Sequence, residues 1–374
     1  MKLSTSIPTV LLTICIAYLA IIFLYAQRFD YNFSGFACIG SRFASPELIG
    51  PRAIVLPGSR GYDGQFFYFA ARDPFILGEA RRSMDVPAYR YGRILYPWLA
   101  ALFALGSPTL IPYTLVLVNL AGVLMGSYFV LRWLRDEGLN LWYAVIYGLL
   151  SGFILCLLRD LAGPVAMGFL VGGLYFISIR RLFTGSFFLG AALLTREVVL
   201  IVPAVFLLFA LFRRQSGKRI LAIILSFAPL LIWSGYVFSR FGNYPFREGE
   251  GNFGVPFAGV IDYGKTILAA SGRASEKVYL AVFLAVCFFS LLLAIREVIR
   301  SKDEISVSFL VFSLFPIFMT TSIWVEPWSY GRVILPAAVL LIVNFIRSRD
   351  RIYLVPLGGH LVLSGVILWW VGIV

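Results

Sequence analysis

Long apolar runs recur along almost the whole chain. They fall near residues 7–27, 109–131, 139–158, 161–179, 198–212, 219–238, 278–295, 305–323, 331–346 and 352–373. A helix needs roughly 20 apolar residues to cross the hydrocarbon layer of a bilayer, which is about 30 Å thick. Of the 374 residues, 60% are hydrophobic and only 14% are charged, whereas soluble domains carry about 25% charged residues. The sequence therefore predicts an all-α, polytopic transmembrane helical bundle.

Two further apolar runs, 94–105 and 183–194, are too short to cross a bilayer unaided. The positive-inside rule, by which basic residues gather in cytoplasmic loops, helps to place them. Suppose that 93–106 stays on the outer surface, while 183–194 and 198–212 form a pair of short crossings. The cytoplasmic loops then hold 15 basic and six acidic residues, and the outer side holds the other 17 basic and 13 acidic residues. This topology has about 11 crossings and a cytoplasmic N-terminus.

An alternative topology makes 93–106 a full crossing and 183–212 one long helix. It would move the basic loops at Arg132 and Arg180 to the outer side. It would also bury the Arg196-Glu197 pair in mid-membrane, which is costly. We therefore favour the first topology, in which two large connections, 28–93 and 239–277, face outward.

The net charge of +13 has a simple explanation in the basic loops of a membrane protein. No soluble basic domain is predicted, so we exclude nucleic acid as a partner. The four cysteines show no paired spacing that indicates a disulfide or a metal site. The sequence also lacks the GxSxG and Walker patterns, and this argues against hydrolase and ATPase activities.

Ionisable side chains at membrane depth are costly and are therefore candidates for function. Here they gather at the predicted outer ends of helices: Asp63, Arg72, Asp73, Arg90, Arg93, Arg159, Asp160, Arg196, Glu197, Glu326 and Arg332. Short helices such as 183–194 would let such groups line a wet cavity below the outer surface. Carboxylates and arginines beside lipid suit a charged amphiphile, such as a lipid-linked phosphate.

Several of these residues also have a purely structural interpretation. Asp63 could cap the helix that begins after it. Arg159 and Asp160 could form an ion pair between two helix ends, and Arg90 and Arg93 could simply reach toward lipid headgroups. Residue spacing alone leaves these alternatives open.

Three segments resemble a group of bacterial multi-pass proteins: YDGQFFY at 62–68, RDPF at 72–75 and PAYRYGRILYP at 87–97. The usual pattern of that group is YDGQFYY, DPF and RY-x-RILYP, from which Phe67 departs. The group is placed with the GT-C superfamily of integral-membrane glycosyltransferases, which use polyprenyl-phosphate-linked sugars. The motifs cover about residues 61–97, and the predicted order of helices and loops is similar over 1–277.

The resemblance implies a GT-C-like catalytic transmembrane module over 1–277, followed by C-terminal transmembrane helices over 278–374. Two surface helices, 62–73 and 93–106, would lie in the first outer loop. The expected location is the bacterial cytoplasmic membrane, with the active site facing outward. The implied partners are a lipid-linked sugar donor and a glycan, lipid or protein acceptor. A divalent cation stays open as a cofactor.

The resemblance also implies which acids are catalytic: Asp63 as the base, and Asp160 from the next outer loop. The activated acceptor hydroxyl would attack the anomeric carbon opposite the phosphate, so that the sugar inverts its configuration. The departing phosphate needs positive charge, for which arginines are suited. The substrate-binding residues that we expect are Tyr62, Gln65, Arg72, Arg90, Arg93, Arg159, Arg196, Glu197 and Arg332.

Two other functions are compatible with a charged cavity beside lipid. One is a transporter or flippase for a lipid-linked saccharide, and the other is a non-catalytic assembly subunit. Transporters usually show internal repeats and helices broken at the midplane, and the sequence shows neither. We therefore predict an enzyme that transfers a hexosyl or pentosyl group from a polyprenyl-phosphate donor.

Overall fold

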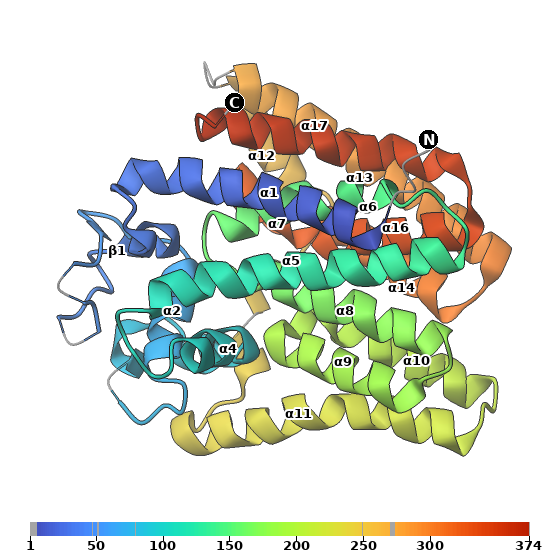
Figure 1. Cartoon of the computed structure of the whole chain (residues 1–374), viewed down its shortest axis with the longest axis horizontal. Coiled ribbons are helices and arrows are strands. Elements are labelled where there is room, and N and C mark those ends of the chain that lie inside the picture. The colour runs from blue at the N-terminus through green and yellow to red at the C-terminus, as the bar shows by residue number, and fades with distance from the viewer. Residues whose placement is uncertain are drawn as a thin grey trace.

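Helices make up most of the structure, a computed structural model that describes residues 6–46, 48–50, 52–78, 80–248, 250–269 and 274–373. Figure 1 shows long helices that run side by side between two ends of the molecule, with short helices and loops gathered at the left end. The longest helices are α1 (Ile7–Ala26), α5 (Ile111–Asp136), α11 (Gly217–Phe241), α13 (Ala274–Ser301) and α17 (Leu354–Trp370).

Shorter helices complete the bundle. Four of them are continuous: α8 (Gly163–Ser178), α9 (Leu182–Thr195), α10 (Ile201–Phe212) and α14 (Glu304–Phe318). The others form two pairs of consecutive helices with a short break between them: α6 (Tyr143–Gly148) with α7 (Ser151–Leu157), and α15 (Pro327–Val333) with α16 (Leu335–Ser348). The remaining α-helices are α2 (Gly64–Arg72), α3 (Pro87–Tyr91), α4 (Leu95–Phe103) and α12 (Ala258–Ala269), and several short 3-10 turns connect the elements. Two short strands, β1 (Ile39–Gly40) and β2 (Val55–Leu56), pair in parallel.

Six helices in the described part of the chain are long and apolar enough to cross a membrane by length and composition. Four more apolar helices, 163–178, 182–195, 197–212 and 304–318, are shorter. Large apolar side chains also stay exposed on the outward faces, including Leu12 on α1, Ile232 on α11 and Phe288 on α13. Lipid, rather than water, is the solvent that suits such faces. The predicted bundle of transmembrane helices is confirmed, whereas the count of eleven crossings stays a prediction.

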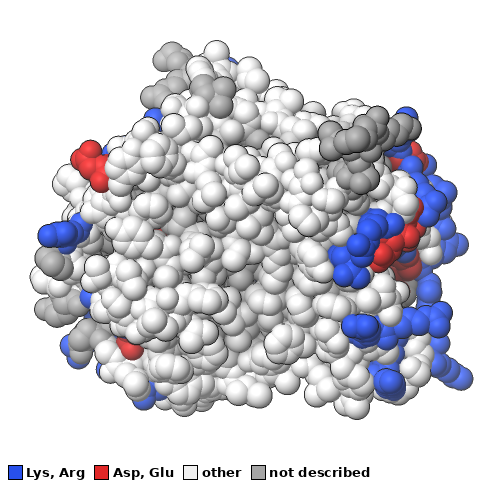
Figure 2. All heavy atoms as spheres, viewed as in Figure 1, with Lys and Arg blue, Asp and Glu red and all other residues white. Residues whose placement is uncertain are grey.

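The loops predicted to be cytoplasmic meet at one end of the molecule. Ion pairs join them to one another: Arg349 with Glu137 at 2.8 Å, Arg296 with Asp350 at 2.6 Å, Arg219 with Glu304, and Arg347 with Asp303. We call this the basic end. Figure 2 shows it on the right, where lysines and arginines are dense, and a face almost free of charge separates it from the opposite end.

The chain reverses direction at Arg196 instead of forming one long helix over 183–212. Arg196 is extended, with φ −157° and ψ 112°, and it separates α9 from the short turn that leads into α10. Both helices return to the basic end, where Arg213 donates a hydrogen bond to the carbonyl of Lys302. Two short helices therefore place Arg196 at the opposite end, which agrees with the topology that we favoured.

Helix α4 occupies the ambiguous segment 93–106. It has nine residues and is therefore about 14 Å long, which is too short to cross a bilayer. It lies near α2 at the end opposite the basic end (Figure 1), which we call the site end.

Close helix packing in the bundle depends on small residues. Gly122 of α5 faces α8, and a Cβ on Gly168 would lie 2.5 Å from the Gly122 carbonyl oxygen. Because neither residue has a side chain, the two backbones approach directly, as is typical of membrane helices.

The orientation of the two ends can be tested with introduced cysteines. Thr109 is exposed in the loop between α4 and α5 at the site end, and Gly217 is exposed at the basic end with open space around it. We expect Thr109→Cys in intact cells to react with a membrane-impermeant thiol reagent, and Gly217→Cys to react only after the membrane is permeabilised. The unsubstituted protein, with its four native cysteines, supplies the background. The reverse labelling pattern would invert the topology.

Candidate active site

Helix α11 holds the second and third motif segments, 72–75 and 87–97, in place. The Trp233 indole donates a hydrogen bond of 2.7 Å to the carbonyl of Tyr91, at the end of α3. The Tyr236 hydroxyl donates one of 2.5 Å to the carbonyl of Phe75. Aromatic side chains with a polar tip are suited to such anchoring because the ring packs while the tip bonds. The arginines on and next to α3 therefore project from a fixed support.

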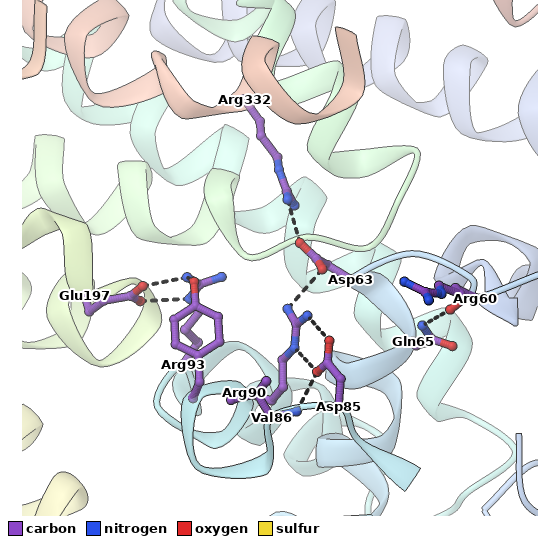
Figure 3. Close-up of polar contacts among 10 residues, drawn as sticks. Arg60, Asp63, Gln65, Asp85, Val86, Arg90, Arg93, Glu197 and Arg332 are labelled. Carbon is purple, nitrogen blue, oxygen red and sulfur yellow. Dashed lines mark hydrogen bonds and ion pairs between the residues drawn. The ribbon is translucent and has the colours of Figure 1, made fainter. Parts of the chain in front are cut away.

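The start of α2 is held from two directions. The Gln65 amide accepts a hydrogen bond from the Gly40 backbone and donates one of 2.8 Å to the Arg60 carbonyl (Figure 3). On the other side Gly64 approaches the backbone of Arg159 so closely that a Cβ would lie 2.1 Å from the Arg159 carbonyl oxygen. Only glycine fits there, which explains the glycine that follows Asp63 in the motif.

Substitution of Gly64 should therefore damage the site. We expect Gly64→Ala to displace α2 and to lower the thermal unfolding midpoint, because overpacking typically costs about 1–3 kcal/mol. Gly235→Ala is the matched control, since Gly235 lies within α11 and a Cβ added there would meet open space. Equal midpoints for the two variants, measured in the same detergent, would contradict the close approach at Gly64.

A cavity of about 470 Å³ opens at the site end. Its wall combines residues from the start of α2, from α3, from the turn between α9 and α10, and from the segments around 252, 319–326 and 329–333. The charged residues that line it are Asp63, Arg90, Arg93, Arg196, Glu197, Glu326 and Arg332. Tyr62, also predicted from the sequence, lines it as well. The tertiary structure thus brings together residues that are far apart in the chain.

The Asp63 carboxylate lies between two guanidinium groups (Figure 3). One oxygen pairs with Arg90 at 2.9 Å, and the other pairs with Arg332 at 2.5 Å. Its side chain makes no capping hydrogen bond to α2, so the helix-cap interpretation is wrong. Burial by itself would raise the pKa of Asp63, but the charges of Arg332 and Arg90 outweigh it and hold the pKa well below its usual range.

The arginines of this cavity differ in how they are paired. Arg90 also binds both oxygens of Asp85 at 2.8 Å. Arg93 makes a two-pronged contact with Glu197, at 2.8 and 2.5 Å. These contacts hold both guanidinium planes in defined orientations, and neither arginine simply extends toward headgroups.

Arg196 differs from the other three arginines. It lines the cavity, yet no described residue gives its guanidinium a hydrogen bond, an ion pair or a ring contact. Burial, together with the neighbouring charges of Arg93 and Arg332, lowers the pKa of this guanidinium. A cation beside other cations and without an anionic partner favours an anionic ligand.

Four predicted site residues do not line this cavity: Gln65, Arg72, Arg159 and Asp160. Gln65 is committed to the backbone contacts described above, and Arg72 donates a hydrogen bond of 3.0 Å to the Tyr68 hydroxyl. A direct role for these four residues in binding or catalysis stays a prediction.

Arg159 and Asp160 do not form the ion pair that the sequence left open. Arg159 donates a hydrogen bond to the Tyr25 hydroxyl, and its guanidinium lies 4.2 Å from the centre of the Trp328 ring. Asp160 is fully buried, and neither carboxylate oxygen has a hydrogen-bond partner among the described residues. Burial raises the pKa of Asp160 well above its usual range, although the nearby Tyr96 acts in the opposite direction. The protonated form is therefore favoured.

The residues around Asp63 do not form a typical metal site. Among the described residues, no three His, Cys, Asp or Glu side chains gather in a way that could hold a metal ion. Both Asp63 oxygens face arginines instead, and a guanidinium beside each oxygen disfavours a cation there.

No protein-family model matches this sequence, and no curated protein matches it. Two solved structures show a distant structural similarity, and both are of ArnT from Cupriavidus metallidurans, at 14% sequence identity. The apo structure gives a TM-score of 0.47, with 90% of this chain and 59% of that chain covered. The structure bound to undecaprenyl phosphate gives 0.49, with 90% and 60% covered. The chain therefore spans less than two thirds of the length of the structures that it resembles.

Two kinds of site residue lie outside the predictions from the sequence. Asp85 supports Arg90, and a sequence signal existed because an acid stands five residues before a motif arginine. Asn252, Phe253 and Ser322 also line the cavity, but they come from segments with no motif. Only the tertiary packing of these segments brings the three residues to the site.

Proposed function

We propose that this protein is a membrane glycosyltransferase that takes a sugar from a polyprenyl-phosphate-linked donor and transfers it to an acceptor hydroxyl. The observation that carries the proposal is the cavity in which Asp63 lies between Arg90 and Arg332, and which Arg196 also lines. A cavity with this charge at one end of a transmembrane bundle suits an anionic headgroup on a lipid.

The cavity offers separate surfaces for the two parts of such a donor. Arg90, Arg196 and Arg332 supply cationic groups for the phosphate. Phe253, Phe315, Met319 and Ile323 supply an apolar wall, and α14 carries Phe315 along the membrane-facing bundle. We therefore place the phosphate among the arginines and the first isoprene units along α14.

Donor binding would change the state of Asp63. In the structure its carboxylate occupies the two arginines that a phosphate would need. When the phosphate engages Arg332 and Arg90, those charges are partly neutralised, and the pKa of Asp63 rises from its depressed value toward the normal range. The bound donor thus makes Asp63 a stronger base than it is in the empty cavity.

Transfer forms one bond at the anomeric carbon and breaks another. The acceptor hydroxyl gives its proton to Asp63 while its oxygen forms a bond to the anomeric carbon. The bond from that carbon to the phosphate oxygen breaks, and its electron pair stays on the phosphate. The arginines stabilise the charge on the departing phosphate. Attack from the face opposite the phosphate inverts the anomeric configuration.

Ligand-dependent unfolding of the purified protein tests the donor site. We expect undecaprenyl phosphate to raise the thermal unfolding midpoint in detergent micelles, because a ligand that binds only the folded state stabilises it. Undecaprenol has the same lipid without the phosphate and should produce no comparable shift. Equal shifts with both lipids would show that the arginines do not bind the phosphate.

A further inference from the structure

A second cavity, of about 640 Å³, lies beside the first at the site end. It is lined by the end of α1, by α12, by the start of α13, by the end of α17 and by the segment 324–328. The proposed chemistry of the first cavity does not use it. Its size is ample for one or two sugar rings.

The two cavities share a short wall. Val325 and Glu326, just before α15, are the residues that line both of them. No described residue forms an ion pair or a side-chain hydrogen bond with the Glu326 carboxylate. Burial raises the pKa of Glu326, with Arg159 and Arg332 acting in the opposite direction. A partly buried carboxylate without partners is available to accept hydrogen bonds from a ligand.

The second cavity differs from the first in charge. The first is lined by four arginines and three carboxylates. The second is lined by three carboxylates, those of Asp262, Glu276 and Glu326, and by two arginines, Arg28 and Arg159. Arg159 is already engaged by Tyr25 and Trp328. A phosphate would therefore be disfavoured in the second cavity, whereas a neutral ligand with hydroxyl groups would not be.

Aromatic side chains complete this second lining. Trp324, Trp328 and Trp370 all line the cavity, as do Tyr25 and Tyr263. Flat aromatic faces bind the apolar C–H faces of sugar rings, while carboxylates accept hydrogen bonds from their hydroxyl groups. Both kinds of group are present together here.

We infer that the second cavity binds the acceptor of the reaction as a neutral saccharide, and that Glu326 accepts a hydrogen bond from one of its hydroxyl groups at the shared wall. This inference rests on the proposed function, because it supplies the second substrate for the same transfer. Because Glu326 lines both cavities, a hydroxyl group bound to its carboxylate lies where the two cavities adjoin, and a neighbouring hydroxyl must extend past Glu326 toward Asp63 to react. In that step the proton goes to Asp63, and Glu326 positions the acceptor without exchanging a proton.

Tryptophan fluorescence tests the acceptor site directly, because three tryptophans line it. The purified protein would be titrated separately with glucose, galactose, mannose and maltose. We expect at least one sugar to change the emission in a saturable way. Glu326→Gln and Trp328→Ala should each weaken the binding of that sugar about tenfold to a hundredfold, as expected for the loss of a hydrogen bond to a charged group or of an aromatic contact.

Matched controls separate the cavity from general effects. Glu137→Gln and Trp142→Ala make the same substitutions at the basic end, where both residues are exposed or half-exposed, and should leave sugar binding unchanged. Glu326→Gln and Trp328→Ala should each unfold in one cooperative thermal transition in detergent, which shows that both variants fold. If Trp328→Ala does not fold, Trp328→Phe replaces it. Trp328→Phe should weaken sugar binding less than Glu326→Gln does.

The outcomes distinguish the two proposals. If the protein binds undecaprenyl phosphate but no sugar changes its tryptophan emission in a saturable way, the proposal of an acceptor site is overturned and the donor proposal stays intact. Sugar binding that depends on Glu326, without phosphate-dependent lipid binding, would overturn the donor proposal and retain the saccharide site. Equal loss of sugar binding in the basic-end controls would also overturn the inference.

Discussion

Asp63→Asn should lower sugar transfer by about 10²–10⁴-fold, the contribution typical of a general base. The same substitution should preserve or strengthen binding of undecaprenyl phosphate, because Arg90 and Arg332 lose the carboxylate that now competes for them. Transfer is therefore lost while lipid binding is kept, whereas a variant that merely misfolds would lose both functions. The measurements are the initial rate of sugar release from a polyprenyl-phosphate-linked donor in proteoliposomes, and the lipid-dependent shift in unfolding midpoint.

Asp85→Asn is the matched control for this prediction. Asp85 shares Arg90 with Asp63 but does not line the cavity. Its removal should loosen Arg90 and reduce transfer only slightly, since surface and half-exposed ion pairs typically contribute about 0–1 kcal/mol. Full transfer activity in Asp63→Asn would remove Asp63 from the mechanism.

Arg332→Gln should weaken undecaprenyl phosphate binding about tenfold to a hundredfold, because hydrogen bonds to charged groups contribute about 1.5–3 kcal/mol. It should also raise the pKa of Asp63, since Arg332 is the charge that lowers that pKa most. The dissociation constant can be measured by titration of the lipid into micelles that contain the purified protein.

Arg42→Gln supplies the comparison for Arg332. Arg42 is exposed, lies beside the Phe43 ring and does not line the cavity. The same loss of charge should therefore leave lipid binding unchanged. If both variants weaken binding equally, the lipid responds to the overall positive charge, and the cavity arginines have no specific role.

Much of the helical architecture was predictable because it depends on properties of short segments. Apolar length predicted α1 and α8 within a few residues, since each such run must be shielded from water wherever it lies. It also located α5 and α13, which continue beyond the apolar runs into charged residues. The cost of placing Arg196 and Glu197 in mid-membrane correctly predicted a reversal between two short helices.

The site was predictable where its residues are close in sequence. Asp63, Arg90 and Arg93 fall within one motif region, and all three line the cavity. Gln65 belongs to the same motif but supports the backbone of Gly40 and Arg60. A motif indicates that a residue matters, but it does not indicate whether the side chain contacts a ligand or holds the backbone in place.

The sequence by itself determined which segments are buried in lipid and which loops carry positive charge, because hydropathy and charge belong to individual residues. Only the tertiary structure decided which charged groups meet. Asp160 and Arg332 both lie at the same end of the bundle, yet Arg332 pairs with Asp63 while Asp160 is buried without an ionic partner among the described residues. The reason is physical: the direction of a side chain depends on how helices pack around it, and that packing joins residues from distant parts of the chain.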